Sequence, residues 1–243
     1  MTNKSLTLPA IFLGLSIATG PTLAGYFIYK GISDAKQADR YVTVKGLVEK
    51  TVKSDGATWV LNTRSPGNDL EKLYQELTTT QKIIKDFLVR AGFIAEEITF
   101  SAPSVNDALA QEWRNGEGPQ YRYILSSSIT VKTANVDLVE KAAQSAGQLM
   151  QQGIALSGMN TSYQLRNFNE LRPQLIAEAT KSARLMAEQF AENSGSQVGS
   201  IRKANQGVIQ ILTPDSDNEW ADNSTSIMKK VRVVSTIDFF LTN

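Results

Sequence analysis

The chain has 243 residues, a formal net charge of +1, 42% hydrophobic and 20% charged residues, and neither cysteine nor histidine. This is the composition of an ordinary globular protein, and its balanced charge offers no basic surface for nucleic acid. The missing residue types exclude disulfides, thiolate nucleophiles and histidine-based catalysis, and they remove the usual ligands of zinc and iron–sulfur sites. We therefore expect no enzyme, no cofactor and no metal site.

The N-terminal segment is predicted to be a membrane anchor. Residues 6–29 carry no charged side chain, and a helix of that length spans roughly 35 Å, enough to cross a bilayer core. We expect residues 1–30 to form an uncleaved single-pass transmembrane helix, followed by a linker over residues 31–39. The alternative is a signal peptide cleaved near Ala24, because small residues precede that point.

The first half of the remaining chain predicts strands and one long helix. Residues 40–50 read as a strand, and Ser54-Asp55-Gly56 stands between two apolar runs. An Asp-Gly pair in such a place is a strong hairpin signal. Asn68 is the expected cap of a helix, with Glu71 three residues later as in a capping box, and Gly92 is its expected end. Strands are expected over residues 98–101 and 121–133.

The second half predicts two more helices among short strands. A helix over residues 136–152 is followed by a strand over 161–166, a helix from the turn holding Pro173 to near Gly195, and strands over 201–213 and 227–241. The order ββαββαβαββ indicates the α+β class, with antiparallel or mixed sheets and three main helices. Residues 40–243 are expected to form one domain, with two subdomains as a variant if the chain divides near residues 103–120.

The third helix carries a ladder of small residues. Ala179, Ala183, Ala187 and Ala191 recur every four residues and lead to Gly195 and Gly199. Such spacing keeps the small side chains on one slowly drifting stripe, where the helix backbone can approach its neighbour closely. A contact between helix and sheet inside one chain is favoured over a contact between subunits. The apolar side of this helix is expected to comprise Leu175, Ile176, Ala179, Ala183, Met186 and Phe190.

The chain resembles the SIMPL-domain family of bacterial periplasmic and envelope proteins over nearly everything after Arg40. The matching elements are Val42-Thr43-Val44-Lys45-Gly46 with the Ser54-Asp55-Gly56-Ala57 step, the alanine ladder, and the closing strand Val231-Arg232-Val233-Val234. Ser54 stands where proline is usual in the family. The resemblance implies a domain on the periplasmic side of the inner membrane, no known enzymatic residues, a tendency to form large oligomers and a link to stress tolerance.

These observations favour a non-enzymatic, membrane-anchored envelope domain that self-assembles and serves as a scaffold or in stress-related binding. Its expected partners are copies of itself, the membrane through residues 6–29, and other envelope proteins. A channel-like or pore-forming oligomer is the alternative, and a hydrolase using a serine–lysine pair is the least favoured one. Trp113 and Trp220 stand on long polar loops, where aromatic side chains often anchor interfaces or fold back over a core.

Overall fold

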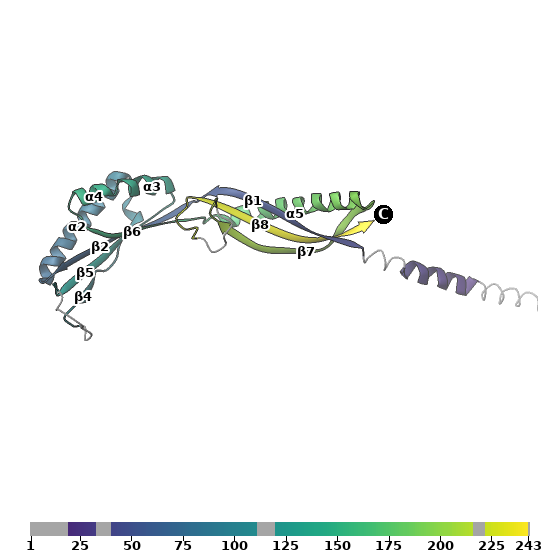
Figure 1. Ribbon diagram of the computed structural model, residues 1–243, viewed down its shortest axis with the longest axis horizontal. Helices are drawn as coiled ribbons and strands as arrows, with labels where there is room; N and C mark the ends of the chain where they lie inside the picture. The colour runs from purple at the N-terminus through teal and green to yellow at the C-terminus, as the bar shows by residue number, and fades with distance from the viewer. Residues whose placement is uncertain (1–18, 33–39, 111–119, 216–221, 243) are drawn as a thin grey trace, which may run out of the picture. The chain divides into compact units, whose positions relative to one another are not determined.

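A computed structural model describes residues 19–32, 40–110, 120–215 and 222–242 (Figure 1). A helix over residues 19–32 comes first. The elements after it are β1 (Tyr41–Lys53), β2 (Gly56–Gly67), α2 (Leu70–Ala91), a 3-10 turn (Ala95–Glu97), β3 (Ile98–Phe100), β4 (Ser104–Asp107), β5 (Tyr123–Thr133), α3 (Val136–Ser145), α4 (Gly147–Gln151), β6 (Leu156–Gln164), α5 (Phe168–Asn193), β7 (Gln197–Leu212) and β8 (Met228–Thr242). They fall into two compact units, one drawn from residues 1–48, 174–209 and 233–243, the other from 49–173 and 210–232.

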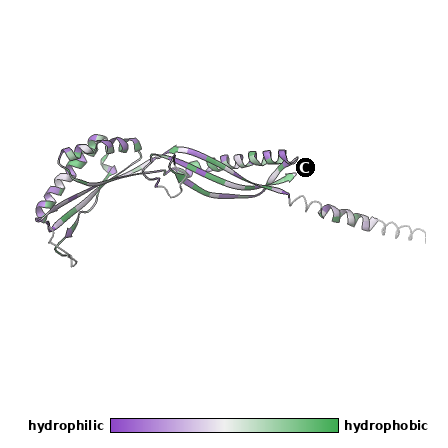
Figure 2. Ribbon diagram, in the orientation of Figure 1, coloured by the Kyte–Doolittle hydropathy of each residue, from purple (hydrophilic) through white to green (hydrophobic). Residues whose placement is uncertain are grey.

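The first unit packs helix α5 on a sheet of order β1-β8-β7. Its core joins Val44 of β1, Ala183 and Ala187 of α5, and Ile237 and Phe239 of β8. Helix α5 mixes hydrophobic and hydrophilic residues along its length (Figure 2). Burial of one stripe of such a helix against a sheet is what holds a single helix in place.

The closest approach in this unit is between α5 and Gly46 of β1. A Cβ placed on Gly46 would overlap the carbonyl oxygen of Ala179 and lie 2.8 Å from the Cβ of Ala183. Ala179 and Ala183 are themselves completely buried. The backbone of α5 therefore rests directly on β1, and the contact requires a glycine on the strand and alanines on the helix.

The second unit is a five-stranded antiparallel sheet with the order β3-β5-β2-β6, and β4 pairs with β5 beside β3. The helices α2, α3 and α4 lie along one face of this sheet (Figure 1). Strand β2 pairs with β5 from Ala57↔Thr133 to Gly67↔Tyr123. The core under the helices is built mainly from these two strands and α2, and its fully buried members include Trp59, Leu61, Ile84, Leu88, Ile129 and Val131.

The predicted α+β class with antiparallel sheets is confirmed, with differences in detail. The expected helix over residues 136–152 is divided at Ala146 into α3 and α4, so α2, α3, α4 and α5 stand where three main helices were expected. Strand β4 falls in a segment expected to be a loop, and β6 begins at Leu156, well before the expected start. The described residues between 103 and 120 belong to the second unit.

The predicted hairpin at Ser54-Asp55-Gly56 is wrong. Strand β1 pairs with β8 in one sheet, whereas β2 pairs with β5 and β6 in the other. The N–H of Ser54 donates to the carbonyl of Ile227 at 2.8 Å, and that of Asp55 donates to the carbonyl of Gln164 at 3.1 Å. These hydrogen bonds to distant residues replace those that would have closed a local turn.

The predicted cap of α2 is displaced by one residue. Asp69 is the N-cap and accepts from the N–H of Lys72 at 3.1 Å, while Asn68 accepts from the N–H of Arg122 at 2.8 Å. Either side chain suits an N-cap, and the contact with Arg122 decides between them. The expected end of the helix is confirmed, because Gly92 follows it with a φ of 110°.

The described part of the N-terminal segment is the helix over residues 19–32, whose apolar side chains, among them Tyr26 and Phe27, are exposed. Residues 1–18, which include much of the predicted anchor, and residues 33–39 of the predicted linker lie outside the described residues. Within the described ranges, no helix has both the length and the apolar character needed to cross a membrane.

The contact at Gly46 predicts the effect of a single methyl group. Gly46→Ala should lower the free energy of unfolding by about 1–3 kcal/mol or more, because rigid backbone and a buried alanine occupy the space. Gly147→Ala is the matched control: Gly147 begins α4 and has nothing within 4 Å of an added Cβ, so alanine should be neutral or slightly stabilising there. Thermal and urea unfolding of both variants would measure this, and equal stabilities would contradict the packing.

Candidate functional site

The structure places the small residues of the ladder in three different settings. Ala179, Ala183, Ala187 and Ala191 are buried within one chain. Gly195 lies just after α5 with a φ of 66°, a conformation that favours glycine at a helix end. Gly199 lies on β7, where an added Cβ would stand 3.2 Å from the carbonyl oxygen of Phe240.

The exposed side of α5 differs from the expected one. Met186 and Phe190 were placed on the apolar side of the helix, yet both are largely exposed. They lie one residue before Ala187 and Ala191, about 100° around the helix from the buried stripe. The stripe is narrow because it consists almost entirely of alanine, so larger neighbours remain outside the contact with the sheet.

Asp55 ties the start of α5 to the end of β1. Its two carboxylate oxygens accept hydrogen bonds from the N–H groups of Arg166, at 2.6 Å, and Asn167, at 2.7 Å. Helix α5 begins at the next residue, Phe168. A carboxylate beside free N–H groups at a helix start is favourable both as a hydrogen-bond acceptor and as a negative charge. Asp55 is therefore a positioning residue for α5 rather than a turn residue.

A buried lysine lies in the second unit. Lys229 of β8 is 1% exposed, and its ammonium group donates to the backbone carbonyl of Asn223. The amide of Asn223 donates in turn to the carbonyl of Ile211. Burial lowers the pKa of Lys229, and the negative charge of Asp222 partly opposes that shift. A charged group removed from water in this way is costly unless it is well paired.

One buried serine, Ser54, is hydrogen-bonded through its backbone to the part of the chain that carries Lys229. The hydrogen bond from Ser54 to the carbonyl of Ile227 places it two residues from Lys229 along the paired strands. However, both side chains are buried, and the hydroxyl of Ser54 has no hydrogen-bond partner among the described residues. The lysine therefore does not activate this hydroxyl, and no substrate reaches it in this conformation. Ser54 and Lys229 therefore do not form a serine–lysine pair in this conformation.

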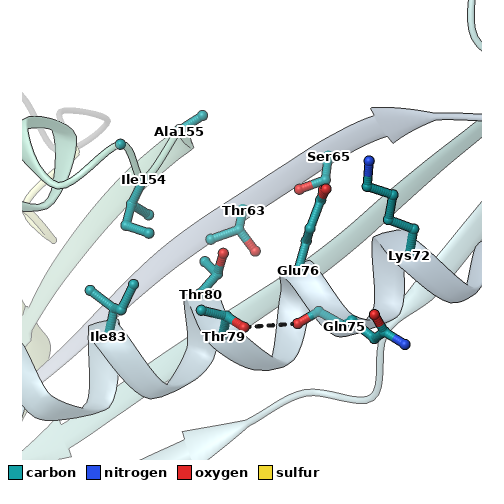
Figure 3. A pocket seen from close by; sticks show the side chains of 11 residues that line it. Thr63, Ser65, Lys72, Gln75, Glu76, Thr79, Thr80, Ile83, Ile154 and Ala155 are labelled. Atoms are coloured by element: carbon teal, nitrogen blue, oxygen red, sulfur yellow. Dashed lines mark hydrogen bonds between the residues drawn. The ribbon is translucent and has the colours of Figure 1, made fainter.

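A groove of about 500 Å³ lies between α2 and β2 in the second unit. Figure 3 shows Lys72 and Glu76 extending from α2 toward β2, on the side where Ser65 lies, with Ile83 and Ile154 at the other end. The middle is lined with hydroxyl groups, among them those of Thr63 and Thr80. A cavity of this size with hydroxyl, amide and aliphatic walls can bind a ligand.

The ionisable side chains that line this groove are one cation and one anion. Lys72 and Glu76 are one helical turn apart on α2, and both are exposed. Exposed charges of this kind are screened by water, and their interaction contributes little to stability. Among the described residues, no group of three or more acidic side chains could hold a metal ion.

The two residues predicted to lie at an interface cannot be placed. Trp113 and Trp220 lie outside the described residues. The structure instead emphasises Gly46, Asp55 and Lys229, which sequence reasoning did not select as site residues. Gly46 and Asp55 stood in the quoted family pattern, but nothing local in the sequence identified what each contacts. Lys229 stands two residues before Val231, at the start of the alternating buried positions of β8, and this alternation was the available signal for its burial.

These observations define a mixed α+β protein with antiparallel sheets, one of whose described sites is a groove suited to binding. The model of the SIMPL family, described as "Protein of unknown function (DUF541)", matches residues 42–237, and the chain therefore belongs to this family. The predicted resemblance is thus confirmed, over a range that covers most of both units. No curated protein matches the chain.

The buried lysine predicts a pH dependence. Since the folded-state pKa of Lys229 lies below its unfolded value, the unfolded chain binds more protons between the two values, and stability rises with pH across that window. The intact protein should therefore gain stability relative to Lys229→Met as the pH is raised from 7 toward 10. Urea unfolding at several pH values would measure the difference, and Lys230→Met is the control. Parallel curves for all three proteins would contradict the burial of a charged lysine.

Proposed function

We propose that this chain is a non-enzymatic, membrane-anchored envelope protein that assembles with copies of itself and serves as a scaffold or in stress-related binding. Membership of a family of unknown function is compatible with this role. The uncharged stretch over residues 6–29 supports an anchor. The observation that carries the proposal is the uncovered edge strand β7.

Strand β7 is left uncovered because one helix cannot cover three strands. A helix is about 10 Å wide and neighbouring strands are about 4.8 Å apart, so a helix covers roughly two of them. Helix α5 lies over β1 and β8, and Val198 near the start of β7 packs against the same core. From Ser200 to Val208 every residue of β7 is exposed, and Val208 is 79% exposed. Both faces of this part of the strand are therefore open.

The second half of this exposed segment lacks the usual protection of a strand edge. Strand edges are commonly protected by charged side chains or proline. Arg202 and Lys203 are charged, and the guanidinium of Arg202 lies 4.0 Å from the ring centre of Tyr41 on the same sheet. Residues 204–209 contain neither charge nor proline. We therefore assign residues 204–209 as the segment that pairs with a second copy by strand addition.

A lysine in this segment should prevent assembly. Val208→Lys supplies the charge that natural edge strands use against pairing, and we expect it to weaken self-association of the detergent-solubilised full chain by about tenfold or more. The control is Val89→Lys, which replaces a half-exposed valine on α2. Light scattering and analytical ultracentrifugation would give the masses. A monomeric wild-type chain, or an oligomer insensitive to Val208→Lys, would contradict the proposal.

The anchor is tested separately. Removal of residues 1–30 should release the chain from membranes into the soluble fraction, since the remaining sequence has the composition of a soluble domain. Intact-mass spectrometry of the full chain should find these residues retained. A mass corresponding to cleavage near Ala24 would favour the exported, unanchored alternative, and insolubility of the shortened chain would argue that residues 1–30 belong to the fold.

A further inference from the structure

Strand β2 extends beyond its neighbour β6. It pairs with β5 as far as Gly67, but its pairing with β6 ends at Thr63↔Leu156, just after a shift in register between Asn62 and Thr63. Residues Arg64 to Gly67 therefore pair with β5 and with no other described strand. Arg64 to Gly67 thus form an edge on the side where β6 would continue, and alternate residues of this stretch turn their backbone groups toward it.

The chain before β6 turns away from this edge. Gly153 has a φ of 80°, and Ile154 is buried in the core, where its N–H donates to the carbonyl of Leu149 at 3.0 Å. The direction in which α4 leads into β6 thus leaves a vacated position where a sixth strand could pair. This vacated position lies in line with β6 and beside residues 64–67.

The vacated position has a hollow on each face of the sheet. On the helix side lies the groove of Figure 3, of about 500 Å³, to which β2 contributes Thr63 and Ser65. On the opposite face lies a second hollow of about 370 Å³, to which β2 contributes Arg64 and Pro66. Ala155 lines both hollows. Consecutive residues of β2 thus alternate between them, which is the pattern that the side chains of an added strand require.

We propose that this vacated position binds a short extended segment of a partner protein, which adds a strand beside residues 64–67. Backbone hydrogen bonds supply affinity in this mode of recognition, and side chains entering alternate pockets supply specificity. This site belongs to the second unit and uses none of the residues assigned to self-assembly on β7, so it goes beyond the proposed function.

The linings of the two hollows specify the chemistry of the segment. The helix-side hollow offers hydroxyl and amide groups from Thr63, Ser65, Gln75, Thr79 and Thr80. The opposite hollow is walled largely by aliphatic groups, from Pro66, Ile124 and Leu156. The expected ligand therefore alternates side chains that hydrogen-bond with small aliphatic ones. Among the residues that line the two hollows, the positive charges of Lys72 and Arg64 are balanced only by the negative charge of Glu76. The resulting net positive charge disfavours a strongly basic segment.

Arg64 and Pro66 are the kind of charged residue and proline that protect a strand edge against pairing with its own copy, so a second copy of the same edge fits this position less well. An isologous antiparallel pairing centred on Ser65 would set Pro66 of each copy opposite Arg64 of the other. Proline has no N–H to donate to the hydrogen-bond ladder between two strands. The pairing would therefore lose one backbone hydrogen bond at Pro66 of each copy. A partner segment can place a residue opposite Pro66 that requires no such bond.

The test uses the detergent-solubilised full chain and a phage-displayed library of short random peptides. Enriched peptides, synthesised with a fluorescent label, should show alternating aliphatic and hydroxyl or amide residues and should bind in anisotropy titrations. Ala155→Trp adds a bulky ring at an exposed residue shared by both hollows, and we expect it to weaken binding about tenfold or more. The control is Ala95→Trp, at an exposed alanine that lines neither hollow.

Two further measurements separate this site from self-assembly. Bound peptide should slow hydrogen exchange of backbone amides among residues 64–67, and Val208→Lys should leave peptide affinity unchanged. Absence of an alternating pattern, or binding insensitive to Ala155→Trp, would overturn the proposal. Enriched peptides that copy a segment of this chain would also overturn it, because they would assign the position to a second copy.

Discussion

The contact between Gly46 and α5 is the constraint on which the first unit depends. The helix backbone lies against the strand, with only alanine methyl groups between them. This closeness keeps the buried stripe narrow, leaves Met186 and Phe190 outside it, and centres α5 on β1 and β8. The open edge of β7 is a consequence, because a helix held there cannot also cover the third strand. The packing and the proposed assembly surface thus have one cause.

Long-range hydrogen bonds at Asp55 show where local sequence signals mislead. The Asp-Gly pair at residues 55 and 56 has the sequence of a hairpin turn, yet its carboxylate binds the N–H groups of Arg166 and Asn167. The signals that depended on periodicity were more reliable, since they predicted α2 and the stretch occupied by α5. The end of α2 was predicted from Gly92 itself. Asn68 and Asp69 are equally good caps by residue type, and only the position of Arg122 distinguishes them.

The groove could not be predicted from the sequence, because it arises from unequal strand lengths. The alternation of β2 and β5 was readable, but the residue at which β6 stops pairing depends on Gly153 and on the burial of Ile154 in the core. The same holds for Lys229, whose burial follows from its place on β8. The family resemblance identified the class of protein, and the sites follow from contacts between residues far apart in the chain.

The proposed assembly requires that a second copy of the chain cover residues 204–209 of β7. Hydrogen exchange of the full chain in detergent, followed by mass spectrometry at high and low protein concentration, tests it most directly. We expect the amides of residues 204–209 to exchange slowly at high protein concentration and faster on dilution. The exchange rates of the amides of β2 and β5 should not change. Fast exchange of residues 204–209 at every concentration, in a protein that is nevertheless oligomeric, would contradict it.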